Sequence, residues 1–250
     1  MGIEIITEPP RSAMVVTPHP DDAEGGCGAT MAKWITEGGT DITVLMCTNG
    51  DKGTGDKDMA PDVLAGIREK EQQDASAYLG VSNVVFLRHP DGTLEDSLQF
   101  RCEVVREIRR YKPEVVFCID PFRVASHTHR DHRMSGQVAL DAAFSYAWSH
   151  LHFPEQITEE GLETHQVKEA FLWGTEAADV YIDVEGYLEA KATSLSLHAS
   201  QMRLRTPADR LERIERGCAR QGEEAGLMYA EGFRRVKFNI GSLDWKLLNT

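Results

Sequence analysis

Residues 13–24 have the sequence AMVVTPHPDDAE. The apolar residues 13–17 are typical of a short buried strand, and the polar residues that follow indicate a loop. A helix is predicted from about residue 24 to residue 37, where Gly38 and Gly39 provide a C-terminal cap. A buried strand that runs through a loop into a helix is the repeating unit of an α/β protein.

The same alternation continues through the first 150 residues. Further strands are predicted at 41–48, 84–87 and 115–118, and further helices at about 61–79, 97–111 and 131–149. Apolar strands that alternate with helices imply a parallel sheet covered on both faces. The prediction is therefore a Rossmann-like, doubly wound and mainly parallel sheet flanked by helices.

The last hundred residues are less regular. They contain two short predicted strands, at 170–173 and 180–182, and two predicted helices, at about 186–200 and 207–222. We interpret residues 1–250 as a single domain, with a core at about 1–150 and a C-terminal α/β extension at about 151–250.

Composition excludes several classes of function. The formal net charge is −13, which argues against binding DNA or RNA through general electrostatics. The five cysteines are scattered and form no Cys-x-x-Cys pair, so neither a disulfide framework nor a thiolate metal site is indicated. The sequence has no run of eighteen apolar residues and no signal-peptide pattern at its start, so we expect a cytoplasmic protein with no membrane partner.

Two short clusters carry the chemistry. Residues 19–24 (HPDDAE) follow the first predicted strand, and residues 127–132 (HTHRDH) lie between the fourth strand and its helix. Because ligands bind at the carboxyl ends of the strands in an open parallel sheet, these two loops are expected to meet in space.

The residue types in these loops suit a catalytic metal site. Catalytic zinc takes three ligands from His, Asp or Glu and keeps one position for water, and His19, Asp22 and His132 can supply that set. Such a site lowers the pKa of the bound water towards about 7. Asp21 is then free to act as the base. Alternatively, the two aspartates belong to an ordinary turn or cap the following helix.

The second cluster supplies candidates for proton transfer. His129 and His132 are three residues apart, so one can bind metal while the other reaches the substrate. His129 could stabilise the developing oxyanion and protonate the leaving amine. Asp131 is a candidate to orient one of the imidazoles, whereas His127 is interpreted as an ordinary loop residue.

These motifs resemble those of the PIG-L/LmbE-like deacetylase family. Beyond the two clusters, similar segments are Arg68–Glu71 (REKE), the sequence HASQ at 198–201 and the sequence YAEGF at 229–233. The resemblance implies a zinc deacetylase with a Rossmann-like fold, acting on N-acetylglucosamine-type groups. It implies the same roles for His19, Asp22, His132, Asp21 and His129.

The resemblance also implies substrate contacts. Arg68 is expected to contact the substrate, although a salt bridge to Glu71 on a solvated helix face is an equal alternative. Asn49, in the loop after the second strand, is expected to form part of the pocket wall. The role of Glu24 is left open, because Ala23 separates it from the position where many family members have it.

The expected substrate is a small N-acetylated sugar or glycoside, and the expected cofactor is one Zn²⁺ per chain. Fe²⁺ could occupy the same ligands. The family resemblance makes a homo-oligomer plausible. The rival functions are another metal hydrolase, such as a phosphoesterase or amidase, and a non-catalytic metal-binding protein of the same fold.

Overall fold

A computed structural model describes residues 2–202 and 206–238. The described residues form an eight-stranded sheet with the strand order β1-β7-β8-β6-β5-β2-β3-β4. The strands are β1 (Glu4–Ile5), β2 (Ser12–Thr17), β3 (Asp41–Thr48), β4 (Asn83–His89), β5 (Val115–Ile119), β6 (Glu169–Trp173), β7 (Val180–Asp183) and β8 (Ala230–Lys237).

The predicted doubly wound parallel sheet is confirmed. Strands β6, β5, β2, β3 and β4 are parallel to one another. From β2 the chain adds β3 and β4 on one side of the sheet, and then β5 and β6 on the other. The C-terminal extension continues this sheet through β6, β7 and β8. Strand β8 is antiparallel to both of its neighbours, and it was not among the predicted strands.

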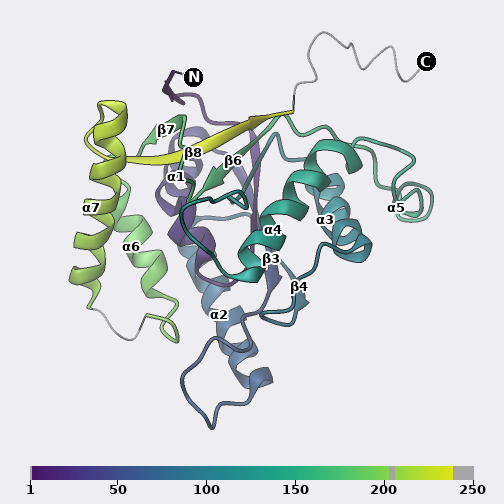
Figure 1. Ribbon diagram of the computed structural model, residues 1–250, viewed down its shortest axis with the longest axis horizontal. Coiled ribbons are helices and arrows are strands. Elements are labelled where there is room, and N and C mark those ends of the chain that lie inside the picture. The colour runs from purple at the N-terminus through teal and green to yellow at the C-terminus, as the bar shows by residue number, and fades with distance from the viewer. Residues whose placement is uncertain (1, 203–205, 239–250) are drawn as a thin grey trace.

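Helices cover both faces of the sheet. Figure 1 shows α1, α6 and α7 on one side and α3 and α4 on the other. The helices are α1 (Asp22–Gly38), α2 (Pro61–Leu79), α3 (Leu98–Tyr111), α4 (Arg130–Asp141), α5 (Glu155–Thr158), α6 (Leu188–Ser196) and α7 (Pro207–Ala225). The predicted helix 131–149 ends earlier than expected, because a π-helical turn (Ala142–Tyr146) follows α4. No helix in the described part of the chain is long and apolar enough to cross a bilayer.

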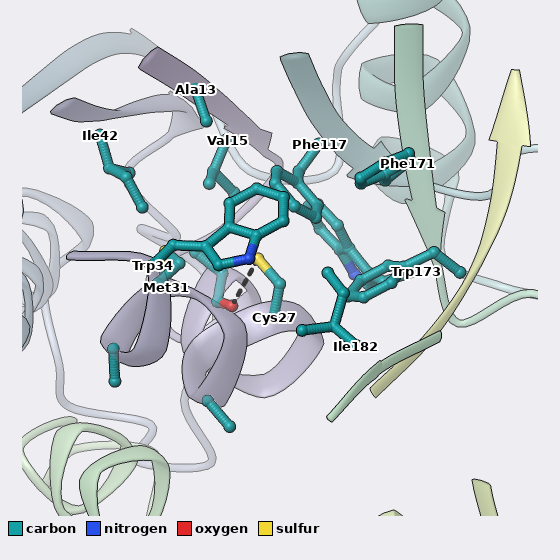
Figure 2. Packing of buried hydrophobic residues seen from close by; sticks show 14 of the residues in the cluster. Ala13, Val15, Cys27, Met31, Trp34, Ile42, Phe117, Phe171, Trp173 and Ile182 are labelled. Atoms are coloured by element: carbon teal, nitrogen blue, oxygen red, sulfur yellow. Dashed lines mark hydrogen bonds between the residues drawn. The ribbon is translucent and has the colours of Figure 1, made fainter. Parts of the chain in front are cut away.

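Alternating strand residues belong to two hydrophobic cores, one on each face of the sheet. Ala13 and Val15 face the α1 side, whereas Met14 and Val16 face α3 and α4. On the α1 side, the Trp34 ring lies 5.3 Å from the ring of Phe117 in β5, and both pack with the strand residues that Figure 2 shows around them. These cores fix α1 and α4 against the sheet. Helix α1 follows β2 and helix α4 follows β5, so both begin on the side of the sheet where these strands end.

The five cysteines are unpaired, as predicted. Cys27, near the start of α1, is fully buried, and burial raises the pKa of its thiol well above the usual value. Cys27 therefore serves as a packing residue rather than as an activated thiol.

Candidate functional site

The site lies at the carboxyl ends of β2 and β5, the point from which the chain builds the sheet in opposite directions. The loop after β2 carries His19 to Asp22, and the loop after β5 leads to His129 and into α4 with His132. Because β2 and β5 are adjacent parallel strands, the two loops meet at their carboxyl ends, as the sequence predicted.

The side chains of the three predicted ligands lie close together. The Nδ1 of His19 lies 3.1 Å from Oδ2 of Asp22, and the Nε2 of His132 lies 3.2 Å from the same oxygen. Bonds of about 2.0–2.1 Å to a tetrahedral metal place neighbouring ligand atoms roughly 3.3 Å apart. Both measured distances are close to that spacing, the three ligand atoms lie within 4.8 Å of one another, and two imidazoles with a carboxylate suit a divalent metal ion.

The other ring nitrogens of both histidines have partners that can accept a hydrogen from them. The Nε2 of His19 lies 3.1 Å from Asp91 and 3.2 Å from Asp131, so its hydrogen is donated to carboxylates. The Nδ1 of His132 lies 3.1 Å from the Thr128 hydroxyl. A metal ion that displaced the protons shared with Asp22 would then meet a lone pair on the facing nitrogen of each histidine, as a metal ligand requires.

Asp131 contacts the His19 ring, where a residue that orients this imidazole would lie. Besides that contact, its Oδ2 accepts from the backbone of Gly92 at 2.6 Å and its Oδ1 accepts from Leu94 at 3.1 Å. The carboxylate thereby ties the loop after β4 to the start of α4 and holds the His19 ring between them.

A second group of potential ligands shares His19 with the first. It consists of His19, Asp91, His129 and Asp131. Asp131 is already engaged by two backbone N–H groups, and His19 faces this group with the nitrogen opposite to the one that faces Asp22. A neutral imidazole has one lone pair, so it serves one of the two positions. The set of His19, Asp22 and His132 fits a metal better.

The charge around His19 also favours a cation. Burial lowers the pKa of His19, but hydrogen bonds to Asp131, Asp22 and Asp91 outweigh it and raise the pKa to about 11. The site therefore stabilises positive charge at this ring. A dication beside it would satisfy the same carboxylates while leaving the histidine neutral.

The two adjacent aspartates have different surroundings. Burial and the neighbouring Asp22 carboxylate raise the pKa of Asp21 to about 7, despite the opposing effect of Arg68. Burial also raises the pKa of Asp22, but hydrogen bonds from His132 and His19 more than reverse this and lower it overall. The alternative that these aspartates cap the helix is wrong for Asp21, since its side chain makes no capping hydrogen bond to α1.

His129 lies beside the ligand set with an exposed ring. Its centroid is 5.0 Å from that of His19 and 5.7 Å from that of His132. Its Nδ1 accepts from the backbone N–H of Asp131 at 3.3 Å, so a neutral ring carries its hydrogen on Nε2. His127 is an exposed loop residue, 3.3 Å from Arg133, in line with the role predicted for it.

Arg68 is buried in the wall of the site. Its guanidinium donates to the carbonyl oxygens of Pro20 at 2.7 Å and Gly50 at 3.1 Å, and lies 3.8 Å from Asp21. The alternative salt bridge to Glu71 is wrong, because Glu71 instead accepts from Ser200. Asn49 lies half-buried after β3, next to the Gly50 carbonyl that Arg68 binds.

Sequence reasoning missed Asp91 and Gln72, and it left the roles of Glu24 and His198 open. Asp91 follows β4 in the sequence His89-Pro90-Asp91, which repeats the His-Pro-Asp of the first cluster at the end of another parallel strand. That repetition was a usable signal. Glu24, Gln72 and His198 form a buried hydrogen-bonded group, and their proximity depends on how α1, α2 and α6 pack.

Comparison with known proteins places this geometry in a family. The model for GlcNAc-PI de-N-acetylase, PIG-L, matches residues 14–143, which include all three candidate ligands. The chain belongs to the PIG-L family. This chain is similar to the diacetylchitobiose deacetylase of Thermococcus kodakarensis. The two are 30% identical over 230 residues, which cover 90% of this chain and 83% of that protein.

Two further comparisons agree with the PIG-L assignment. A 1D-myo-inositol 2-acetamido-2-deoxy-alpha-D-glucopyranoside deacetylase of Mycobacteroides abscessus is 28% identical over 77% of this chain and 82% of its own length. The solved structure of N,N'-diacetylchitobiose deacetylase from Pyrococcus horikoshii superposes with a TM-score of 0.82 at 26% identity, covering 95% of this chain and 89% of that one.

Proposed function

We propose that this protein is a zinc-dependent deacetylase that hydrolyses the N-acetyl group of an N-acetylglucosamine-type sugar or glycoside. The observation that carries the proposal is the His19–Asp22–His132 set with Asp21 beside it. A protein that only bound metal would need the ligands but not the adjacent carboxyl group. The deacetylase names of the relatives support the amide as the bond that is broken.

The residues divide the reaction between them. A zinc ion held by His19, Asp22 and His132 would act as a Lewis acid for water and for the acetyl carbonyl. Asp21 would take the proton of the attacking water on its carboxylate, with a pKa raised to about 7 placing it close to neutral pH. His129 would donate from Nε2 to the developing oxyanion and then to the departing amine nitrogen.

Substrate contacts extend the proposal to the walls of the site. Asn49 and Arg68 lie on the β3 side, where Arg68 also braces two backbone carbonyls. We propose one zinc per chain, with Fe²⁺ as a substitute that the same ligands accept. We also propose that the chain works as a homo-oligomer, as its resemblance to the family suggests.

The decisive test is release of primary amine from a panel of N-acetylated sugars, with and without chelator. Amine release that chelator abolishes and zinc restores supports the proposal. Release of phosphate from phosphate esters, with no amine released, would favour the rival phosphoesterase.

Replacing Asp21 tests the mechanism directly. Asp21→Asn removes the base but leaves the three ligands, so we expect zinc to remain bound while kcat falls by about 100-fold or more. Metal content by mass spectrometry and steady-state kinetics measure the two effects. His127→Gln, in the exposed part of the same site region, is the control and should retain its activity. Full activity in Asp21→Asn would overturn the assignment of the base.

A further inference from the structure

Two side chains of α2 hold the two ends of one peptide group in the site loop. The peptide joins Pro20 to Asp21. Its carbonyl oxygen accepts from Arg68 Nη2 at 2.7 Å, and its N–H donates to Gln72 Oε1 at 3.3 Å. Arg68 and Gln72 are four residues apart, so they lie on the same face of the helix, and both are buried.

The residue that follows this peptide group, Asp21, has an unusual backbone conformation. Asp21 has φ of 100° and ψ of −24°, in the left-handed region that residues with a Cβ atom seldom occupy. Such conformations cost free energy and persist only where the surroundings hold them. The direction of the Asp21 carboxyl group follows from this backbone, so whatever fixes the peptide also aims the side chain.

The orientation of the Gln72 amide is itself fixed by buried partners. Its Nε2 donates to Glu24 Oε1 at 2.7 Å and to the Ser76 hydroxyl at 3.0 Å. The other Glu24 oxygen lies 3.2 Å from Nε2 of His198, two residues after the end of α6. Because a carboxylate accepts hydrogen bonds, Glu24 holds the NH₂ group of Gln72 and leaves its oxygen to face Asp21.

This chain of contacts is completely enclosed. Glu24, Gln72 and His198 are each 0% exposed. A buried polar group is costly unless its hydrogen bonds are made, so replacing one member disturbs the others. The chain runs from α6 through α1 and α2 to the backbone of the proposed base, without touching the three candidate ligands.

We propose that Gln72 is a positioning residue for Asp21, and that Glu24 and His198 act by orienting Gln72. The inference rests on the proposed deacetylase function, in which Asp21 takes the proton from water. Gln72 contributes no proton and touches no substrate. It holds the Pro20–Asp21 peptide so that the Asp21 carboxyl group faces the reacting atoms.

The first test removes the hydrogen-bond acceptor of Gln72. Gln72→Met keeps the length of the side chain but removes its acceptor, so we expect kcat to fall by about tenfold to 100-fold. KM should change by less, and zinc should stay bound at one per chain. Gln73→Met makes the same change at the next, exposed position of α2 and should leave kcat unaltered.

Exchanging the two partners separates positioning from packing. Gln72→Glu alone sets two carboxylates against each other and should lower kcat. Gln72→Glu combined with Glu24→Gln can remake every hydrogen bond, since the carboxylate at 72 accepts from Asp21 and the amide at 24 bridges it to His198. We expect the double variant to recover kcat to within about threefold of the wild type, because the geometry at Asp21 is restored.

Hydrogen exchange at the Asp21 amide gives a readout that needs no substrate. Faster exchange in Gln72→Met than in Gln73→Met supports the role of Gln72 in holding the Pro20–Asp21 peptide. A lack of deacetylase activity in the wild type would count against the proposed function, but not against this role of Gln72. An active wild type whose Gln72→Met variant keeps its kcat would overturn the inference. A double variant no better than Gln72→Glu would overturn it as well, including when Gln72→Met fails to fold.

Discussion

The Asp131 carboxylate links three parts of the site, because it contacts Gly92, Leu94 and the Nε2 of His19 at once. Asp131→Asn leaves one oxygen where two are needed, so one amide NH₂ group must face a backbone N–H. With the NH₂ group at the Oδ2 position His19 loses this acceptor, and with it at the Oδ1 position the bond from Leu94 that holds Asp131 against the ring is lost. We expect metal affinity to fall by about 10–100-fold, measured by competition with a chromophoric chelator. Asp96→Asn, an exposed change nearby, is the control, and equal affinities in the two variants would contradict this role.

At the scale of elements, Gly136 sets how closely α4 approaches β5. A Cβ atom there would lie 2.3 Å from the carbonyl oxygen of Ile119, whereas one at Gly66 in α2 would meet no atom within 4 Å. Gly136→Ala should therefore destabilise the fold by about 1–3 kcal/mol, and Gly66→Ala should stabilise it by about 0.5–1 kcal/mol. Urea denaturation measures both. The same sign for both variants would show that helix propensity, and not the close approach, determines the effect.

The loop before α4 is held by a carboxylate from the β6–β7 connection. Glu176 accepts from the backbone N–H groups of Val124, Ala125 and Ser126, and these bonds lower its pKa to about 2. A folded-state pKa below the unfolded value stabilises the loop above the unfolded pKa, and this effect is lost as the pH falls through about 2. We expect the three amides to stay protected from hydrogen exchange from pH 7 down to about 5. Glu176→Gln should expose them at pH 7, and unchanged exchange there would contradict the role of Glu176.

The sequence predicted well the elements that a local pattern of residues marks. Continuous apolar runs marked β2, β3 and β5, and glycines at 39 and 80 marked the ends of α1 and α2. Strand β8 escaped prediction because its sequence, AEGFRRVK, has a glycine and three basic residues and pairs with strands distant in sequence. The histidine loops were predictable from strand topology, whereas the Gln72 contacts depend on helix packing that no local pattern records.

At the scale of the whole molecule, the fold of this acidic protein brings several carboxylates together at the carboxyl ends of the strands. The net charge is −13, and Asp22, Asp91 and Asp131 contact His19 at the carboxyl ends of the strands, with Asp21 next to Asp22. A bound dication neutralises part of this charge. Metal that binds only the folded state should therefore stabilise the protein, by about 2.7 kcal/mol at a free concentration 100 times Kd.

The number of metal ions decides between the deacetylase and a dinuclear hydrolase. His19 lies between the two groups of potential ligands and has one lone pair to offer, so we expect one zinc per chain by native mass spectrometry. Asp91→Asn removes a carboxylate that only the second group contains and keeps an oxygen that can accept from His19, so the stoichiometry should stay at one zinc per chain. Two zinc ions per chain in the wild type, falling to one in Asp91→Asn, would show that both groups bind metal. That result would favour the dinuclear alternative, because a pair of ions can stabilise both the attacking and the leaving oxygen of a phosphate ester.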